Sequence, residues 1–161
     1  MVLFAALVIT TNLFSQTIAK WKMTDVEKYM KAKNGEVLVI NFWATFCKPC
    51  VAEIPSFISI TEKYKADNVK LLLVSLDLPS FYPAKVAAFA KKNNYNTHIV
   101  WLNETNADYF CPKLDPKWSG SIPATLILNT KTGYRKFFED QIPEAVFEKE
   151  LQLAIASSAT N

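Results

Sequence analysis

A run of apolar residues, 37–42, is followed closely by two cysteines that are separated by two residues. The run is apolar except for Asn41, as strands are when both faces of a parallel sheet are buried. Pro49, between Cys47 and Cys50, suits the first turn of a helix. A helix that starts at Cys47 would place both sulfurs on one face, within one turn. The chain is therefore expected to fold around a buried strand that leads to a dithiol at a helix N-terminus.

This spacing favours dithiol–disulfide exchange over other uses of cysteine. At the positive end of the helix dipole, Cys47 would be favoured as a thiolate. With Cys50 in reach, that thiolate could attack a disulfide and then release its partner by closing an internal disulfide. A structural zinc site usually needs four ligands, and the chain offers only these two thiols, Cys111 and His98. Two inert core cysteines are the other alternative, although the Lys48-Pro49 pair argues against a buried strand or mid-helix position.

The segment 41–50, followed by Glu53 and Pro55, resembles the active-site region of the thioredoxin superfamily. It is most similar to the TlpA/ResA-like extracytoplasmic thiol–disulfide oxidoreductases of that superfamily. A second segment, 120–128, resembles the cis-proline loop of the family and the strand that follows it. Two motifs in the expected order are far more specific than the cysteine spacing alone, and the resemblance covers about residues 21–156.

The resemblance implies an α/β protein with the thioredoxin-like fold, in which helices flank a central mixed sheet. An extra helix is expected to be inserted in the middle of the fold, within 80–94. The apolar patterns agree with this order of elements. They predict strands at 37–42, 69–76, 98–102, 125–129 and 134–138, the last two antiparallel. They predict helices at 24–34, 49–65, 83–94 and 144–156, and a short helix plus loop within 103–119.

The resemblance also assigns roles to residues of both motifs. Cys47 is expected to be the attacking nucleophile and Cys50 the resolving thiol. The peptide bond before Pro123 is expected to be cis, and Ile122 to offer backbone groups to an extended partner peptide. The only redox group implied is the Cys47–Cys50 disulfide, with no separate cofactor and no metal. Cys111 lies outside both motifs; we expect it to be structural or incidental, and a regulatory thiol or a third member of the relay are the alternatives.

Further residues near the cysteines are expected to contact substrate, and these are Trp43, Phe46, Lys48 and Pro49. Glu53 is expected near the thiols, with a pKa raised by partial burial, where it would move protons for the resolving cysteine. A solvated helix glutamate is the alternative interpretation.

Two positions depart from the family pattern. Asn41 stands where cytoplasmic thioredoxins have a buried aspartate, as it does in many exported relatives. Phe46 stands where a tryptophan usually precedes the first cysteine, so it keeps an apolar platform but removes an indole N–H donor.

The N-terminal residues, 1–19, resemble a secretory signal peptide. The first charged residue is Lys20, the stretch 2–9 is apolar, and 10–17 is more polar. No Lys or Arg follows Met1, so an uncleaved anchor and a buried N-terminal strand are the alternatives. We expect cleavage between Ser15 and Ala19, a thioredoxin-like domain over 20–161 and an extracytoplasmic location, periplasmic or secreted.

The composition excludes several other classes of protein. A chain of 161 residues is most simply one domain with its own core, and we expect it to act as a monomer. The net charge is +3 and no run of Lys or Arg is present, which argues against a nucleic-acid partner. With 3 glycines the chain has no Gly-rich phosphate-binding loop.

The leading hypothesis is an exported protein thiol–disulfide oxidoreductase that acts as a reductant. Its substrate would be a protein disulfide, in an apocytochrome or another exported protein, and a membrane or exported donor would re-reduce it. A thiol peroxidase is one alternative, but such a site would need Thr or Ser where Ala44 stands and a distant arginine, and Arg135 is the only arginine. A non-catalytic binding module or chaperone is the other alternative.

Overall fold

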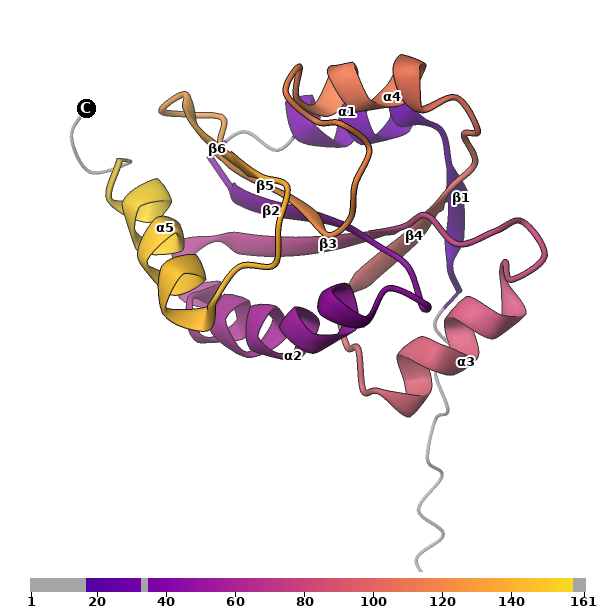
Figure 1. The fold of residues 1–161 in the computed structure, drawn as a ribbon. Coiled ribbons are helices and arrows are strands. Elements are labelled where there is room, and N and C mark those ends of the chain that lie inside the picture. The colour runs from indigo at the N-terminus through magenta and orange to yellow at the C-terminus, as the bar shows by residue number, and fades with distance from the viewer. Residues whose placement is uncertain (1–16, 33–34, 158–161) are drawn as a thin grey trace, which may run out of the picture.

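The computed structural model describes residues 17–32 and 35–157 (Figure 1). The elements in chain order are β1 (Ala19–Trp21), α1 (Met23–Ala32), β2 (Val37–Trp43), α2 (Lys48–Lys63), the 3-10 turn η1 (Lys65–Asp67), β3 (Val69–Ser75), α3 (Ala84–Lys92), β4 (His98–Leu102), α4 (Ala107–Leu114), β5 (Ala124–Asn129), β6 (Tyr134–Phe138) and α5 (Glu144–Ala156). The predicted strands and helices are present close to their expected bounds. The predicted export segment up to residue 16, and the predicted end of the first helix at Asn34, lie outside the described residues.

The strands form one mixed sheet in the order β1-β4-β3-β2-β5-β6. β1, β4, β3 and β2 are parallel to one another, whereas β5 is antiparallel to both β2 and β6. In the registers, Trp43 faces Ser75 and Phe42 faces Ala124. At one end of the strands, therefore, the carboxyl ends of β2 and β3 lie beside the start of β5. This arrangement confirms the predicted mixed α/β fold.

Helices cover both faces of the sheet, with α1 and α4 on one side and α2, α3 and α5 on the other (Figure 1). α3, which links β3 to β4, is the predicted inserted helix. The side chains of β2 alternate between the two cores. Those of Leu38, Ile40 and Phe42 pack in the α1/α4 core, and those of Val39 and Trp43 pack in the opposite core. Among the described residues, no helix is both long enough and apolar enough to cross a bilayer.

The N-terminal strand β1 is an addition to the predicted elements, and it occupies the edge of the sheet beside β4. Ala19 pairs with Val100, and the preceding Ile18 is 3% exposed. The hydroxyl of Tyr82 donates to the carbonyl of Ile18 at 3.1 Å. β1 overlaps the predicted export segment only at Ala19, so the prediction for residues 1–19 stays a prediction.

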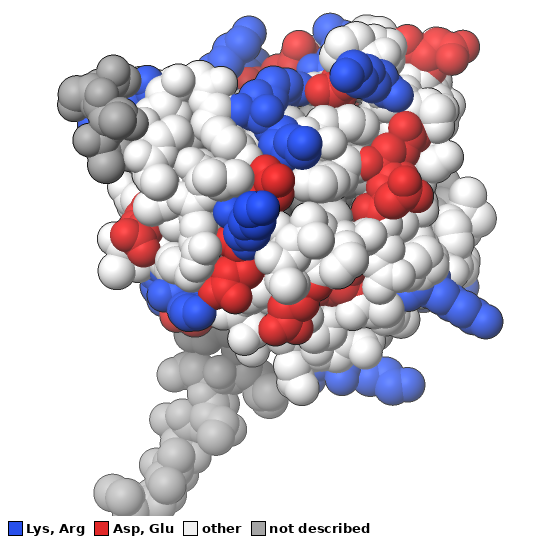
Figure 2. Space-filling model, turned by 60° about the vertical axis from the view of Figure 1, so that its left-hand side comes forward, with Lys and Arg blue, Asp and Glu red and all other residues white. Residues whose placement is uncertain are grey.

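The surface carries charges of both signs. On the face seen in Figure 2, Lys and Arg side chains are interspersed with Asp and Glu side chains.

Candidate active site

The two cysteines of the CxxC motif lie at the N-terminus of α2 and are joined by a disulfide bond, with their Cα atoms 5.3 Å apart. Cys47 is the N-cap residue, and the backbone N–H of Cys50 donates to its Sγ at 3.3 Å. The helix can begin here because Cys47 is extended and Pro49 needs no N–H partner in the first turn. Cys47 is 8% exposed and Cys50 is fully buried. Cys47 is therefore the more exposed residue of the pair, and it sits at the positive end of the helix dipole.

The loop before β5 lies against this disulfide. Its peptide bond Ile122–Pro123 is cis, and the carbonyl oxygen of Ile122 is 3.7 Å from the Sγ of Cys47. The structure thus brings the two sequence motifs together. A second cis bond, Tyr82–Pro83, precedes α3 and was not expected from the sequence.

The loop at 119–121 is held by a carboxylate that no sequence motif indicates, Glu139. One oxygen of Glu139, just after β6, accepts the N–H of Ser119 at 2.8 Å, that of Ser121 at 3.1 Å, and the hydroxyl of Ser119. Partial desolvation alone would raise its pKa, but the hydrogen bonds from Ser119 and from the backbone of the loop lower the pKa of Glu139 below its usual value. No motif marks this residue, because it becomes visible only through the pairing of β5 with β6.

Glu53 is buried beneath the site, at 3% exposure, rather than solvated. One carboxylate oxygen accepts from the amide of Asn41 at 2.9 Å, and the other accepts from the backbone N–H of Ile142 at 2.9 Å. The same amide group of Asn41 donates to the hydroxyl of Thr125 at 2.9 Å. Burial raises the pKa of Glu53 from 4.5 to about 7, against the opposing effect of the two hydrogen bonds. This side chain can therefore take up or release a proton near neutral pH.

α2 continues through Pro55, which lies inside the helix. Proline has no N–H, so the carbonyl of Val51 has no helical donor. The hydroxyl of Tyr95 donates to that carbonyl at 3.4 Å. Burial raises the pKa of Tyr95 to about 12, so the hydroxyl keeps its proton. The carbonyl that Pro55 leaves without a helical donor is thus hydrogen-bonded by a side chain from outside α2.

The predicted substrate contacts separate into two groups. Phe46 is 61% exposed, and Lys48 and Pro49 are also exposed beside the disulfide. Trp43 is instead fully buried, with its ring 5.6 Å from that of Tyr95. Its position at the end of a strand inside the core prevents direct contact with a partner, so it supports the site from below.

The third cysteine and the single arginine lie apart from the redox pair. Cys111 is buried and free, and burial, together with the nearby Glu139 and Asp108, raises its pKa to about 11. It therefore stays a thiol at neutral pH. Arg135 pairs with Leu128 in the β5–β6 ladder, several residues away from the end of β5 that meets the cysteines. Within 17–32 and 35–157, no group of three or more His, Cys, Asp or Glu side chains is placed to hold a metal ion.

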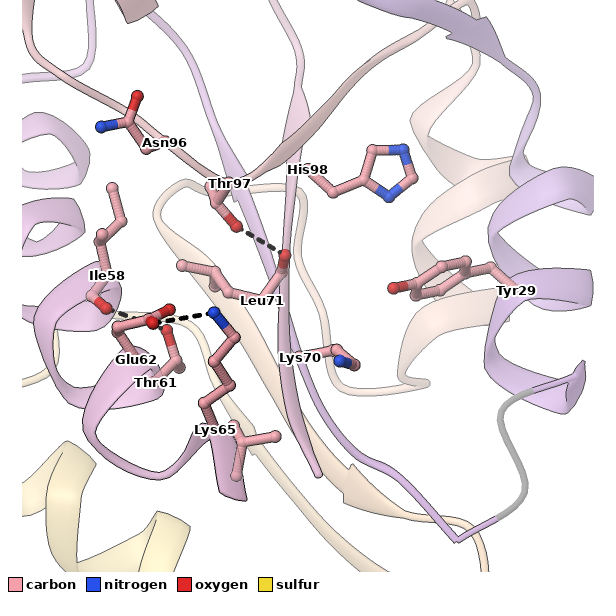
Figure 3. A pocket seen from close by; sticks show the side chains of 11 residues that line it. Tyr29, Ile58, Thr61, Glu62, Lys65, Lys70, Leu71, Asn96, Thr97 and His98 are labelled. Atoms are coloured by element: carbon pink, nitrogen blue, oxygen red, sulfur yellow. Dashed lines mark hydrogen bonds and ion pairs between the residues drawn. The ribbon is translucent and has the colours of Figure 1, made fainter. Parts of the chain in front are cut away.

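A separate hollow lies toward the opposite end of the sheet (Figure 3). It is lined by the first residues of β3 and β4, by the end of α2 and by Tyr29 of α1. An ion pair between Lys65 and Glu62, at 2.9 Å, lies at its wall, and the hydroxyl of Thr97 donates to the carbonyl of Leu71 at 2.9 Å. It contains neither cysteine of the disulfide, so it is not part of the candidate site.

Comparison with known proteins decides the family. The model of the AhpC/TSA family matches residues 12–133. The chain belongs to the AhpC/TSA family. It is 31% identical to the thiol-disulfide oxidoreductase ResA of Geobacillus kaustophilus over 94% of this chain and 90% of that protein. This chain spans less than two thirds of the length of three other curated relatives, with matches over 56%, 22% and 65% of those proteins. The predicted resemblance to ResA-like thiol–disulfide oxidoreductases is thereby confirmed.

Two solved structures agree with the fold. StoA from Bacillus subtilis aligns with a TM-score of 0.54 and 26% identity, over 73% of this chain and 83% of that one. A secreted disulfide oxidoreductase from Mycobacterium tuberculosis aligns with a TM-score of 0.58 and 16% identity, over 76% and 85%. These matches confirm the thioredoxin-like architecture of this family member.

Proposed function

We propose that this protein is a thiol–disulfide oxidoreductase that reduces disulfides of other proteins through Cys47 and Cys50. The observation that supports it most directly is the disulfide at the N-terminus of α2, with the carbonyl of Ile122 beside its more accessible sulfur. The names of two relatives, the thiol-disulfide oxidoreductase ResA and the sporulation thiol-disulfide oxidoreductase A of Bacillus subtilis, point to the same class of reaction.

The reaction proceeds in two exchange steps from the reduced protein. The Cys47 thiolate attacks one sulfur of the substrate disulfide, so a mixed disulfide forms and the other substrate sulfur leaves as a thiolate. The Cys50 thiolate then attacks the Sγ of Cys47, which closes the Cys47–Cys50 disulfide and releases the second substrate thiolate. Two electrons pass to the substrate, and a donor dithiol must supply two electrons to start the next cycle.

Each residue near the pair has a part in this scheme. The helix N-terminus and the N–H of Cys50 stabilise the attacking thiolate. Glu53, with its pKa near neutrality, accepts the proton of Cys50 before the second step. Phe46, with Lys48 and Pro49, forms the exposed rim against which the partner lies, and Ile122 pairs with the partner backbone as an added strand would.

The protein acts outside the cytoplasm, as a monomer, on exported proteins or an apocytochrome. The signal-like residues 1–19 support this location, as does the secreted M. tuberculosis oxidoreductase with the same fold. Cell fractionation, together with the mass of the N-terminal peptide of the isolated protein, tests it. Recovery in the cytoplasmic fraction with an intact N-terminus would contradict it.

The reduction potential of the Cys47–Cys50 pair is the main test of the function. It is measured by equilibration in defined thiol buffers and alkylation of the free thiols. A value near the thioredoxin end, about −270 mV, supports a reductant, and a value near about −120 mV would make the protein an oxidant. If no reversible disulfide forms, the proposal fails.

Three further measurements test the exchange mechanism and its alternatives. A Cys50→Ser variant should trap partner proteins as mixed disulfides, and a Cys47→Ser variant, the matched control, should not. Full cellular activity in a variant without both thiols would favour a binding module or chaperone. Peroxide consumption tests the peroxidase alternative. Ala44 disfavours it, as does the place of Arg135 on β6, away from the end of β5 that meets the cysteines.

A further inference from the structure

Asp77 lies at the carboxyl end of β3, and its side chain is 3% exposed. Both of its carboxylate oxygens accept the backbone N–H of Thr45, at 3.2 and 3.1 Å. The hydroxyl of Thr45 also donates to this carboxylate, at 2.5 Å. The residue is therefore bound to the loop that leads from β2 to the first cysteine.

Asp77 is itself held in place by the last residue of β3 and by a side chain of β4. The hydroxyl of Ser75 donates to its carboxylate at 2.8 Å and accepts the N–H of Asp77 at 3.1 Å. The indole N–H of Trp101, on β4, donates to the backbone carbonyl of Asp77 at 2.7 Å. Every hydrogen bond to the carboxylate comes from a neutral donor, and such bonds to an ionised group are stronger than neutral pairs.

The loop that Asp77 holds is short and ends at the redox pair. Thr45 is followed by Phe46 and then by Cys47, whose N–H donates to the carbonyl of Ala44 at 3.0 Å. The position of the Cys47 sulfur against the N–H of Cys50 therefore depends on a turn whose second residue is fixed by a buried carboxylate.

We propose that Asp77 is a positioning residue for the redox cysteines. Its carboxylate fixes Thr45, and through the Ala44–Cys47 turn it keeps the Cys47 sulfur at the N-terminus of α2. Without it the turn relaxes, the reduced thiolate loses its N–H partner, and the reduced form becomes less stable relative to the disulfide. The inference rests on the proposed function, because it concerns the rate and equilibrium of that exchange.

The test compares Asp77→Ala with the wild-type protein at a temperature where both are folded. We expect attack of the reduced protein on a model disulfide to slow at least tenfold. We expect the exchange equilibrium with glutathione to shift up to tenfold toward the disulfide, which corresponds to about 30 mV toward more negative potential. Thr45→Val keeps the backbone N–H, so it should give a smaller effect in the same direction. It replaces Asp77→Ala as the test if that variant does not fold.

A double-mutant cycle identifies the route of the effect. If Asp77 acts through Thr45, then Asp77→Ala and Thr45→Val combined should change the rate by less than the product of the two single effects. Asp115→Asn is the matched control, since Asp115 is a buried carboxylate that accepts a backbone N–H, from Lys117, outside this turn. It should lower stability without moving either the rate or the potential.

Three results would overturn the proposal. The first is an Asp77→Ala protein that loses stability but keeps rate and equilibrium within twofold of the wild-type values. The second is multiplicative behaviour of the two substitutions in the cycle. The third is a faster rate in both Asp77→Asn and Asp77→Ala, because the carboxylate would then act through its charge. A wild-type protein that forms no reversible disulfide would refute the proposed function itself, and is distinguished by its lack of exchange before any substitution.

Discussion

The amide of Asn41 donates to the carboxylate of Glu53 at 2.9 Å in the interior between β2 and α2. Asn41 is fully buried, and its amide oxygen has no hydrogen-bond partner among the described side chains and backbone. An ionised Glu53 accepts a hydrogen bond from the NH₂ group of Asn41. If the amide turns by half a turn, its oxygen can accept a hydrogen bond from a protonated Glu53, because an amide both donates and accepts. The pair can therefore accommodate both charge states of Glu53 at one buried position.

Burial of Glu53 makes stability depend on pH. Because its folded pKa of about 7 lies above its ordinary 4.5, the folded state binds more protons between these values, and stability should fall as pH rises through that window. Glu53→Gln should remove this dependence and raise the free energy of unfolding at pH 8 by on the order of 3 kcal/mol. Urea unfolding of the oxidised protein from pH 4 to 8 measures it. Glu62→Gln, at an exposed position of α2, should keep the wild-type slope, and an unchanged slope in Glu53→Gln would contradict the assignment.

The hydroxyl of Tyr95 substitutes for the N–H that Pro55 lacks. Tyr95→Phe should cost about 1 kcal/mol, because it leaves the carbonyl of Val51 without a donor. In a Pro55→Ala background the restored N–H can serve that carbonyl, so Tyr95→Phe should cost clearly less. Denaturant unfolding of the four proteins gives the coupling. An equal cost of Tyr95→Phe in both backgrounds would show that the hydroxyl does not serve this carbonyl.

Glu139 should matter for binding of the partner more than for the potential of the disulfide. Glu139→Ala removes the acceptor of the loop at 119–121, so we expect a severalfold rise in KM for a protein disulfide, with the potential unchanged. Since its folded pKa is lowered, its contribution to stability is present above its ordinary pKa and is lost as pH falls through the folded value. The control is Asp140→Ala, a substitution at the adjacent, exposed position. A change in potential with unaltered KM would contradict this role.

The strand β1 should be a stabilising part of the domain. Ile18 is buried against the core that contains Val86 and Trp101, so Ile18→Ala should cost about 2 to 4 kcal/mol. Leu153→Ala, at 47% exposure on α5, should be nearly neutral. Thermal unfolding of a chain that begins at Thr17 measures both variants. Equal midpoints for the two would show that the edge strand is dispensable.

The elements that could be predicted from the sequence are those with a strong local pattern. β2 and β3 are continuous apolar runs, and the β5–β6 pair flanks a turn that contains Gly133. β1 could not be predicted, because three residues carry no periodicity and its partner β4 lies far away in the chain.

The same limit applies to the candidate site. Cys47, Cys50 and the Ile122–Pro123 bond follow from motifs, and Glu53 follows from its offset along the helix. Asp77 and Glu139 have no such signal, because each acts on a loop contributed by another strand. Trp43 differs from its predicted role for a related reason, since an aromatic residue beside a motif can face either the partner or the core.

The antiparallel direction of β5 has a practical consequence for experiments on this protein. Since β5 starts beside the cysteines and runs away from them, the turn after Asn129 lies at the other end of the sheet. Ala124 and Asn129 are five residue steps apart along the strand, a distance of about 17 Å. Exposed loop tips tolerate insertions well. A fluorophore or an affinity tag placed at Lys131 can therefore report on, or immobilise, the protein while the exposed rim around Cys47 stays uncovered.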